Sequence, residues 1–199
     1  MSPLRPFCCK KVGCDGFSEF KTKLKLYLQQ NHRSFVTNAQ ETLTEFFERT
    51  LKTDYQQTIR EAAAAIANAD HVIFVGSGSS GILAEYGSRY FSAFKKFSVY
   101  IKDPFFPIYG HYFNNCVAIA LSVSGETSYT LSQVHRLKEK GSTIISITNR
   151  KHCSLAKISD YNLTYYVNTE FIEQTNVTTQ IPVIYLLESL AKEMYRLMN

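Results

Sequence analysis

Short apolar runs alternate with helical stretches along most of this chain, and this alternation restricts its possible folds more than any other feature. The run Cys116–Leu121 is apolar at every position. Strands that are apolar on both sides are typical of parallel sheets whose two faces are covered by helices. We therefore predict a doubly wound α/β fold, a three-layer α-β-α sandwich with a five-stranded parallel sheet of the flavodoxin-like kind, preceded by N-terminal helices. The predicted strands are His71–Val75, Ser98–Ile101, Cys116–Leu121, Thr143–Thr148 and Leu163–Val167.

Capping and breaking residues mark the helices between these strands. Thr53 and Gln56 form a capping-box pattern at the start of a helix from about Asp54 to Asn68. Gly141 follows the last position of another helix, as glycine commonly does. The other expected helices are Gly81–Phe94, Thr127–Lys140, a short helix near Ser154 and a long terminal helix after Pro182.

A loop rich in glycine and serine follows the first predicted strand and opens the next helix. Its sequence is Gly76-Ser77-Gly78-Ser79-Ser80-Gly81. Parallel sheets bind ligands at the carboxyl ends of their strands, where the start of a helix offers unpaired N–H groups to an anion. Glycine lets the backbone approach closely, and serine adds hydroxyl donors. The loop therefore predicts a site for a phosphate ester.

Two other interpretations of this first loop stay open from its residues alone. Gly76, Gly78 and Gly81 also match the GxGxxG pattern of dinucleotide-binding folds, and Asp103 stands about where such folds keep a ribose-binding acid. An ordinary turn explains Asp103 equally well, because it lies in Lys102-Asp103-Pro104. The third interpretation is a glycine-rich turn that binds no ligand.

A second loop rich in hydroxyl groups follows the third predicted strand. Its sequence is Ser122-Val123-Ser124-Gly125-Glu126-Thr127, and it also opens a helix. Alone it could be a simple helix cap. Two such loops on neighbouring strands can hold one ligand between them, and a dinucleotide fold has no need of the second. The pair therefore favours a phosphate ester over a dinucleotide.

Charge and hydropathy narrow the class of protein. Residues 1–34 contain seven Lys and Arg and two acidic residues, whereas residues 35–199 contain fifteen of each kind. This basic segment could contact nucleic acid or be a solvated terminus. No apolar stretch has the length of a membrane span, and no secretory signal opens the chain, so we expect a cytoplasmic protein without membrane contacts.

The paired motifs GSGSSG and SVSGET resemble the signature of SIS (sugar isomerase) domains over about residues 50–199. The resemblance implies that the two loops hold a phosphorylated sugar or amino sugar. Its expected hydroxyl ligands are Ser80, Ser122, Ser124 and Thr127. The full set of expected ligand-binding residues is Gly76, Ser77, Gly78, Ser79, Ser80, Ser122, Ser124, Gly125, Glu126 and Thr127.

The N-terminal segment is similar to the end of the helix-turn-helix domain of RpiR-type transcription regulators. The similar stretches are Cys9–Gly13 and Gly16–Lys21. This implies that residues 1–34 are the remnant of a DNA-binding domain with its connecting helix, and residues 35–199 the phosphosugar-binding SIS domain. Pro3 and Pro6 stand where the recognition helix should run, and proline inside a helix costs about 3 kcal/mol. We expect a regulator that begins late, so that DNA binding requires the complete helix-turn-helix.

The resemblance implies an effector domain without catalysis, which senses a phosphosugar for a regulator of carbohydrate metabolism. Another departure from the family pattern, Thr179-Gln180 in place of the frequent Ser-Arg, implies that the effector differs from that of many members. The first alternative is an aldose–ketose phosphate isomerase, which needs a general base; the candidates are Glu126, Glu173 and His111. The second alternative is the dinucleotide-binding module.

The sequence gives little indication of an oligomer and none of a metal or a cofactor. An apolar stripe with heptad-like spacing in the terminal helix could line a homodimer or homotetramer contact, or pack on the chain's own sheet. Its members are Val183, Leu187, Leu190, Met194 and Leu197. The five histidines and five cysteines lack metal-binding and CxxC spacings, so we expect free thiols, no metal and no cofactor.

Overall fold

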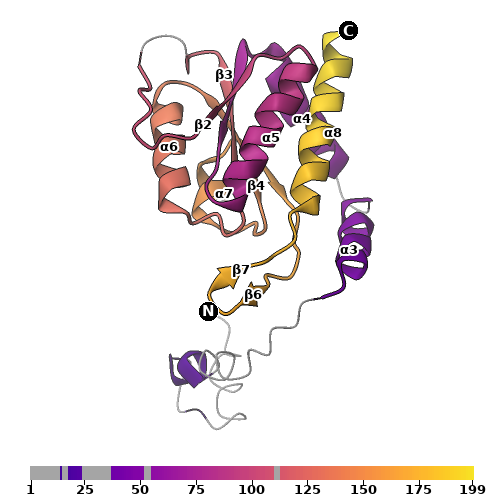
Figure 1. Cartoon of the computed structure of the whole chain (residues 1–199), viewed down its shortest axis with the longest axis vertical. Helices are drawn as coiled ribbons and strands as arrows, with labels where there is room; N and C mark the ends of the chain where they lie inside the picture. The colour runs from indigo at the N-terminus through magenta and orange to yellow at the C-terminus, as the bar shows by residue number, and fades with distance from the viewer. Residues whose placement is uncertain (1–13, 15–17, 24–36, 52–54, 110–112) are drawn as a thin grey trace, which may run out of the picture. The chain divides into compact units, whose positions relative to one another are not determined.

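The computed structural model describes residues 14, 18–23, 37–51, 55–109 and 113–199 (Figure 1). The chain divides into two compact units, one made of residues 1–37 and 170–177 and the other of residues 38–169 and 178–199. The first unit contains an antiparallel hairpin formed by β6 (Phe171–Ile172) and β7 (Thr175–Asn176). The sheet and helices considered below belong to the second unit. None of the helices in the described ranges is long and apolar enough to cross a membrane.

The second unit is built on a sheet of five parallel strands in the order β2-β1-β3-β4-β5. All seven residues of β3 are buried, because β3 is the central strand and is covered on both faces. The sheet confirms the predicted five-stranded parallel, flavodoxin-like arrangement. The strands are β1 (His71–Val75), β2 (Ser98–Ile101), β3 (Cys116–Ser122), β4 (Thr143–Thr148) and β5 (Tyr161–Thr164).

Helices cover both faces of the sheet, as the apolar strands predict. One face packs against α4 (Tyr55–Asn68), α5 (Ser79–Ala93) and α8 (Ile181–Met198), and the other against α6 (Ser128–Glu139) and α7 (Ser154–Ile158). Alternate residues of each strand serve the two cores, because successive side chains in a strand point to opposite faces. In β1, for example, Phe74 belongs to the core under α8 and Val75 to the core under α6. The three-layer sandwich is thereby confirmed.

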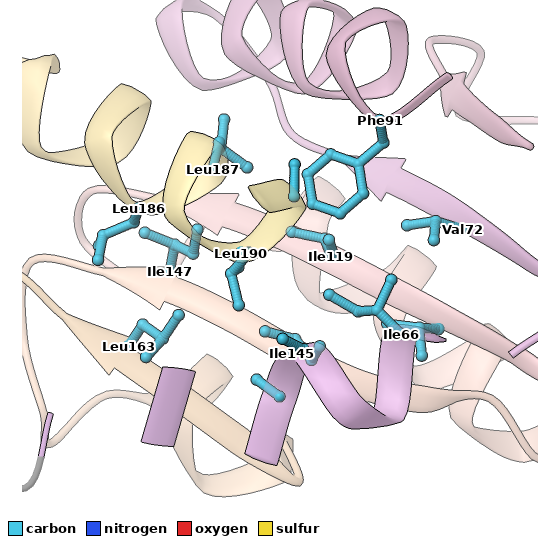
Figure 2. Packing of buried hydrophobic residues seen from close by; sticks show 14 of the residues in the cluster. Ile66, Val72, Phe91, Ile119, Ile145, Ile147, Leu163, Leu186, Leu187 and Leu190 are labelled. Carbon is cyan, nitrogen blue, oxygen red and sulfur yellow. The ribbon is translucent and has the colours of Figure 1, made fainter. Parts of the chain in front are cut away.

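The terminal helix α8 supplies the centre of the larger core (Figure 2). Its Leu186, Leu187 and Leu190 lie against the isoleucines of β3 and β4, and none of the three has any exposed surface. Four members of the predicted stripe are buried within this chain, and only Leu197, 51% exposed, lies outside the core. The stripe therefore packs on the chain's own sheet, and it gives no support to an oligomer contact.

A helix that the sequence analysis did not delimit, α3 (Ala39–Leu51), precedes α4. Its Phe46 is 1% exposed and makes an edge contact with the ring of Tyr185 on α8, at 5.6 Å between centroids. The capping-box residue Thr53 lies outside the described residues. The helix expected after it runs from Tyr55 to Asn68, which is close to the prediction.

The position of the fifth strand was predicted wrongly. It spans Tyr161–Thr164 rather than Leu163–Val167. Tyr165 still donates its N–H to the carbonyl of Thr148, but Tyr166 has a positive φ of 51°, which ends the extended backbone. The strand therefore begins at half-buried Tyr161 and Asn162, which an apolar pattern does not select.

Candidate functional site

The strand order places the carboxyl ends of β1 and β3 side by side at one edge of the sheet. These strands are neighbours, with Val75 paired to Ala120, but α5 leaves β1 toward one face and α6 leaves β3 toward the other. Neighbouring connections that diverge in this way form a topological switch point, which is where open α/β sheets bind ligands. The first predicted loop lies between β1 and α5, and the second between β3 and α6. The structure thus brings both predicted loops to this switch point.

The first loop leaves the start of α5 open. Its N-cap residue is Gly78, which has φ 58° and no side chain with which to cap the helix. The N–H groups of Gly81 and Ile82 bond to the carbonyl of Gly78, at 3.0 and 3.2 Å. The first N–H groups of a helix have no partner within that helix. The N–H groups of Ser79 and Ser80, which come before those of Gly81 and Ile82, are not capped by any described side chain and remain available to an anion.

The serines of the first loop differ in exposure. Ser79 is exposed and Ser77 is half-buried, whereas Ser80 is 7% exposed on the first turn of α5. Tyr100 of β2 supports the loop by donating a hydrogen bond from Oη to the carbonyl of Gly76, at 3.2 Å. Gly76 itself allows the close approach of the helix, since a Cβ there would lie 2.6 Å from the carbonyl oxygen of Ser80.

The second loop is held by its own hydroxyl groups. Ser122 Oγ accepts a hydrogen bond from the N–H of Gly125 at 3.0 Å and lies 3.1 Å from Thr127 Oγ1. Ser124 Oγ accepts from the N–H of Glu126 at 3.1 Å. Thr127 is the N-cap residue of α6, but its side chain contacts Ser122 and does not cap the helix. The start of α6, like that of α5, is therefore open to an anion.

Gly125 allows the second loop to lie close to the start of α7. Its φ is 69°, and a Cβ at this position would lie 2.2 Å from Cys153 Sγ. The carbonyl of Gly125 accepts the N–H of Leu155 at 3.0 Å. Cys153 Sγ in turn accepts the N–H of Ala156. The start of α7 is thus occupied by protein groups, in contrast to the starts of α5 and α6.

Glu126 also connects the second loop to the start of α7. Its Oε1 accepts the N–H of Ser154 at 2.8 Å. Hydrogen bonds from Ser154, with smaller effects of Lys157 and Arg150, hold the pKa of the Glu126 carboxyl below its usual value. A carboxylate that is kept ionised and bonded to the backbone supports the loop, and is a poor match to a base whose pKa lies near neutrality.

The remaining acid and base candidates belong to the other compact unit, stabilise their own turn or lie outside the described residues. Glu173 is exposed in the turn between β6 and β7, in the other compact unit, with φ 53°. His111 lies outside the described residues. Asp103 Oδ1 accepts the N–H of Phe105 at 2.8 Å, so this residue stabilises its own turn.

Three residues that support the loops were missed by the sequence analysis: Tyr100, Cys153 and Asn149. Asn149 supports the second loop by donating its backbone N–H to the carbonyl of Val123, at 3.1 Å. Each of the three comes from a different segment and contacts a loop through tertiary packing, for which a single sequence gives no local signal. Two hollows are lined, among the described residues, by residues that belong to neither loop. One, of about 470 Å³, runs along α3, and the other, of about 430 Å³, lies beside β5 and is lined by Tyr55, Lys151 and Asn162 among others.

A family model described as "SIS domain" matches residues 65–191, which include both loops. An uncharacterized HTH-type transcriptional regulator of Clostridium perfringens is 30% identical over 204 residues, which cover 94% of this chain and 73% of that protein. Two further HTH-type regulators, of Caldanaerobacter subterraneus and Bacillus subtilis, are matched over 62% and 61% of their own length. The chain thus spans less than two thirds of these two relatives.

Solved structures share the fold. The Vibrio vulnificus NanR protein complexed with ManNAc-6P has a TM-score of 0.64 and 17% identity, covering 96% of this chain and 71% of that one. A Methanococcus jannaschii protein, for which a 3-hexulose-6-phosphate isomerase function was inferred, has a TM-score of 0.67 and 17% identity, covering 79% of this chain and 88% of that one. At these identities the similarity establishes the fold alone.

Proposed function

Because this chain belongs to the SIS domain family and its relatives include several HTH-type transcriptional regulators, we propose that it binds a phosphorylated sugar or amino sugar as the effector-binding part of a regulator of carbohydrate metabolism. The observation that carries the proposal is the pair of uncapped helix starts, those of α5 and α6, which follow the neighbouring strands β1 and β3. The complex of NanR with a phosphorylated amino sugar supports the ligand class.

In this proposal the phosphate lies between the two loops. Ser80 donates its hydroxyl from α5, beside the open N–H groups of both helices. Ser124 and one member of the bonded pair Ser122 and Thr127 donate theirs from the second loop, and the other member of the pair donates to its partner. A hydrogen bond to a charged group contributes about 1.5–3 kcal/mol. Four or five of them, less the costs of desolvation and ordering, correspond to micromolar to millimolar affinity. Such affinities suit a sensor of a metabolite.

The domain assignment follows from the same proposal. Residues 35–199 form the phosphosugar-binding domain, and residues 1–34 form the end of a helix-turn-helix domain with its connecting helix. DNA binding requires the complete helix-turn-helix. Ligand binding then changes operator affinity through a coupling free energy, typically about 1–3 kcal/mol, or five- to 150-fold.

The proposal assigns no catalysis to the chain. Proton transfer between adjacent sugar carbons needs a base within reach of the ligand. Glu126 is engaged by Ser154, and Glu173 belongs to the other compact unit. Turnover of hexose or pentose phosphates that is lost in Glu126→Gln or Glu173→Gln would instead establish an isomerase.

Thermal unfolding tests the proposal with a panel of phosphosugars, amino-sugar phosphates, their unphosphorylated parents and NADH. A ligand at 100 times its dissociation constant adds about 2.7 kcal/mol to the free energy of unfolding, a shift of several degrees for a chain of this size. We expect this shift with one phosphosugar and none with its parent sugar.

Variants then locate the site. Ser80→Ala and Ser124→Ala should abolish the ligand-induced shift. The matched control is Ser132→Ala, which removes an exposed hydroxyl further along α6 and should keep the shift. A shift that survives both loop variants would place the ligand elsewhere, and a shift with NADH alone would favour a dinucleotide.

A further inference from the structure

One buried side chain, that of Asn149, connects the second loop to the segment that follows β5. Asn149 is 5% exposed and comes directly after β4. Its backbone N–H donates to the carbonyl of Val123, at 3.1 Å, in the middle of the second loop. The backbone of Asn149 therefore contacts the second loop, and its side chain extends to the segment that follows β5.

The side-chain amide of Asn149 is bonded to this segment through both its donor and its acceptor. Nδ2 donates to the carbonyl of Val167 at 2.7 Å and to Thr169 Oγ1 at 3.3 Å. Oδ1 accepts the N–H of Val167 at 2.6 Å. An amide matches the N–H and C=O of a backbone in the way a neighbouring strand does, and no carboxylate or apolar side chain can make both bonds. The amide thus holds the chain where β5 has ended.

The segment held by Asn149 continues directly into the other compact unit. Thr169 is followed by Glu170, whose carboxylate accepts hydrogen bonds from the N–H and the hydroxyl of Thr37. Thr37 lies at the end of residues 1–37, which that unit contains. Residues 167–169 are therefore held by the side chain of Asn149. The next residue in the chain, Glu170, is bonded to Thr37.

We propose that Asn149 is a positioning residue that couples occupancy of the second loop to the order of residues 167–169. The inference rests on the proposed function and specifies its regulation. A ligand that fixes Ser122 and Ser124 also fixes Val123 between them, and through it the backbone of Asn149. Because linkage is reciprocal, a change that loosens residues 167–169 must also loosen the loop.

Amide hydrogen exchange of the whole chain, resolved by residue, tests this coupling in two arms. In the first arm, without added ligand, Asn149→Asp removes the Nδ2 donor and keeps the acceptor. We expect exchange to accelerate about tenfold at Val167 and also, across the contact, at Gly125 and Glu126 in the loop. Thr169→Val, a milder variant at an exposed position, should produce a smaller acceleration at the same amides. Asn162→Asp is the matched control, because the amide of Asn162 bonds to Ser146 and Thr148 within the sheet.

The second arm uses inorganic phosphate as the probe. Phosphate should slow exchange at Val167 several-fold in the parent chain and in Asn162→Asp. In Asn149→Asp it should still perturb the amides of the second loop but no longer slow Val167, a result that simple destabilisation does not give. Loop amides that are unaffected by Asn149→Asp and Thr169→Val in the first arm would overturn the coupling. Coupling in the first arm without phosphate binding in the second would overturn the proposed function and the ligand dependence inferred here, while the mechanical link between loop and segment would stand.

Discussion

Gly125 is the residue on which the shape of the second loop depends most directly. Gly125→Ala places a side chain in the left-handed region, at φ 69°, which costs about 1–3 kcal/mol. The new Cβ also meets Cys153 Sγ at 2.2 Å, and relieving such an overlap costs about a further 1–3 kcal/mol. We expect the free energy of unfolding, measured in urea, to fall by the sum of both effects.

Gly141→Ala separates these two causes. Gly141 has φ 84°, but a Cβ there would meet nothing closer than 3.7 Å. This control should therefore show only the backbone cost. Adding Cys153→Ala to Gly125→Ala should recover part of the loss. Equal losses for the two glycine variants would mean that the contact with Cys153 does not constrain the loop.

At the scale of the elements, helices α5 and α8 are joined by a polar contact whose contribution to stability depends on pH. Tyr86 Oη donates to Glu188 Oε1 at 2.9 Å, and this bond, with a smaller contribution from Lys192, holds the pKa of Glu188 below its usual 4.5. Burial, and then the same bond, raise the pKa of Tyr86 to about 12. A carboxyl whose pKa is lowered by folding stabilises the fold above its unfolded pKa, and the contribution is lost as pH falls through the folded value.

Tyr86→Phe should therefore destabilise the chain in a pH-dependent manner. We expect the free energy of unfolding to fall by about 1 kcal/mol near pH 7, because the bond is charge-assisted but partly open to solvent. The difference between variant and parent should shrink as the pH falls below 4.5. Tyr90→Phe, which removes a longer bond of 3.4 Å to the same carboxylate, should have a smaller effect. A difference that is independent of pH would exclude Glu188 as its cause.

Also at the scale of the elements, the sequence predicted some strands accurately and misplaced or missed others, and each outcome has a physical reason. The predictions of β1, β2 and β4 agree with the structure residue for residue. β1 and β4 are interior strands, buried at every position but the first, and such strands must be largely apolar, whereas β2 is a partly buried edge strand. β5 was misplaced because its first two residues, Tyr161 and Asn162, are only half-buried, so the strand does not begin with an apolar run. The strands β6 and β7 have two exposed residues each, which are too few to show a periodic pattern.

At the scale of the whole molecule, the location of the candidate site could be predicted from the topology of the sheet. The contacts that support the two loops could not. Two hydroxyl-rich loops after neighbouring parallel strands must meet at one edge of the sheet, so their residues could be named in advance. The supporting contacts of Tyr100, Asn149 and Cys153 depend on how separate segments pack, and the role of Glu126 became visible only through its bond to Ser154. The ligand-binding role of the loop residues stays a prediction.

The most direct test of the central claim is a titration of the ¹⁵N-labelled chain, followed by its amide resonances, with the phosphosugar that gives the largest thermal shift. The account predicts that the amides of Ser79 and Ser80 at the start of α5 and those of Thr127 and Ser128 at the start of α6 shift together, with one dissociation constant, and that the parent sugar leaves them unchanged. Shifts confined to one loop, or centred on the hollow beside β5 near Tyr55 and Lys151, would contradict it.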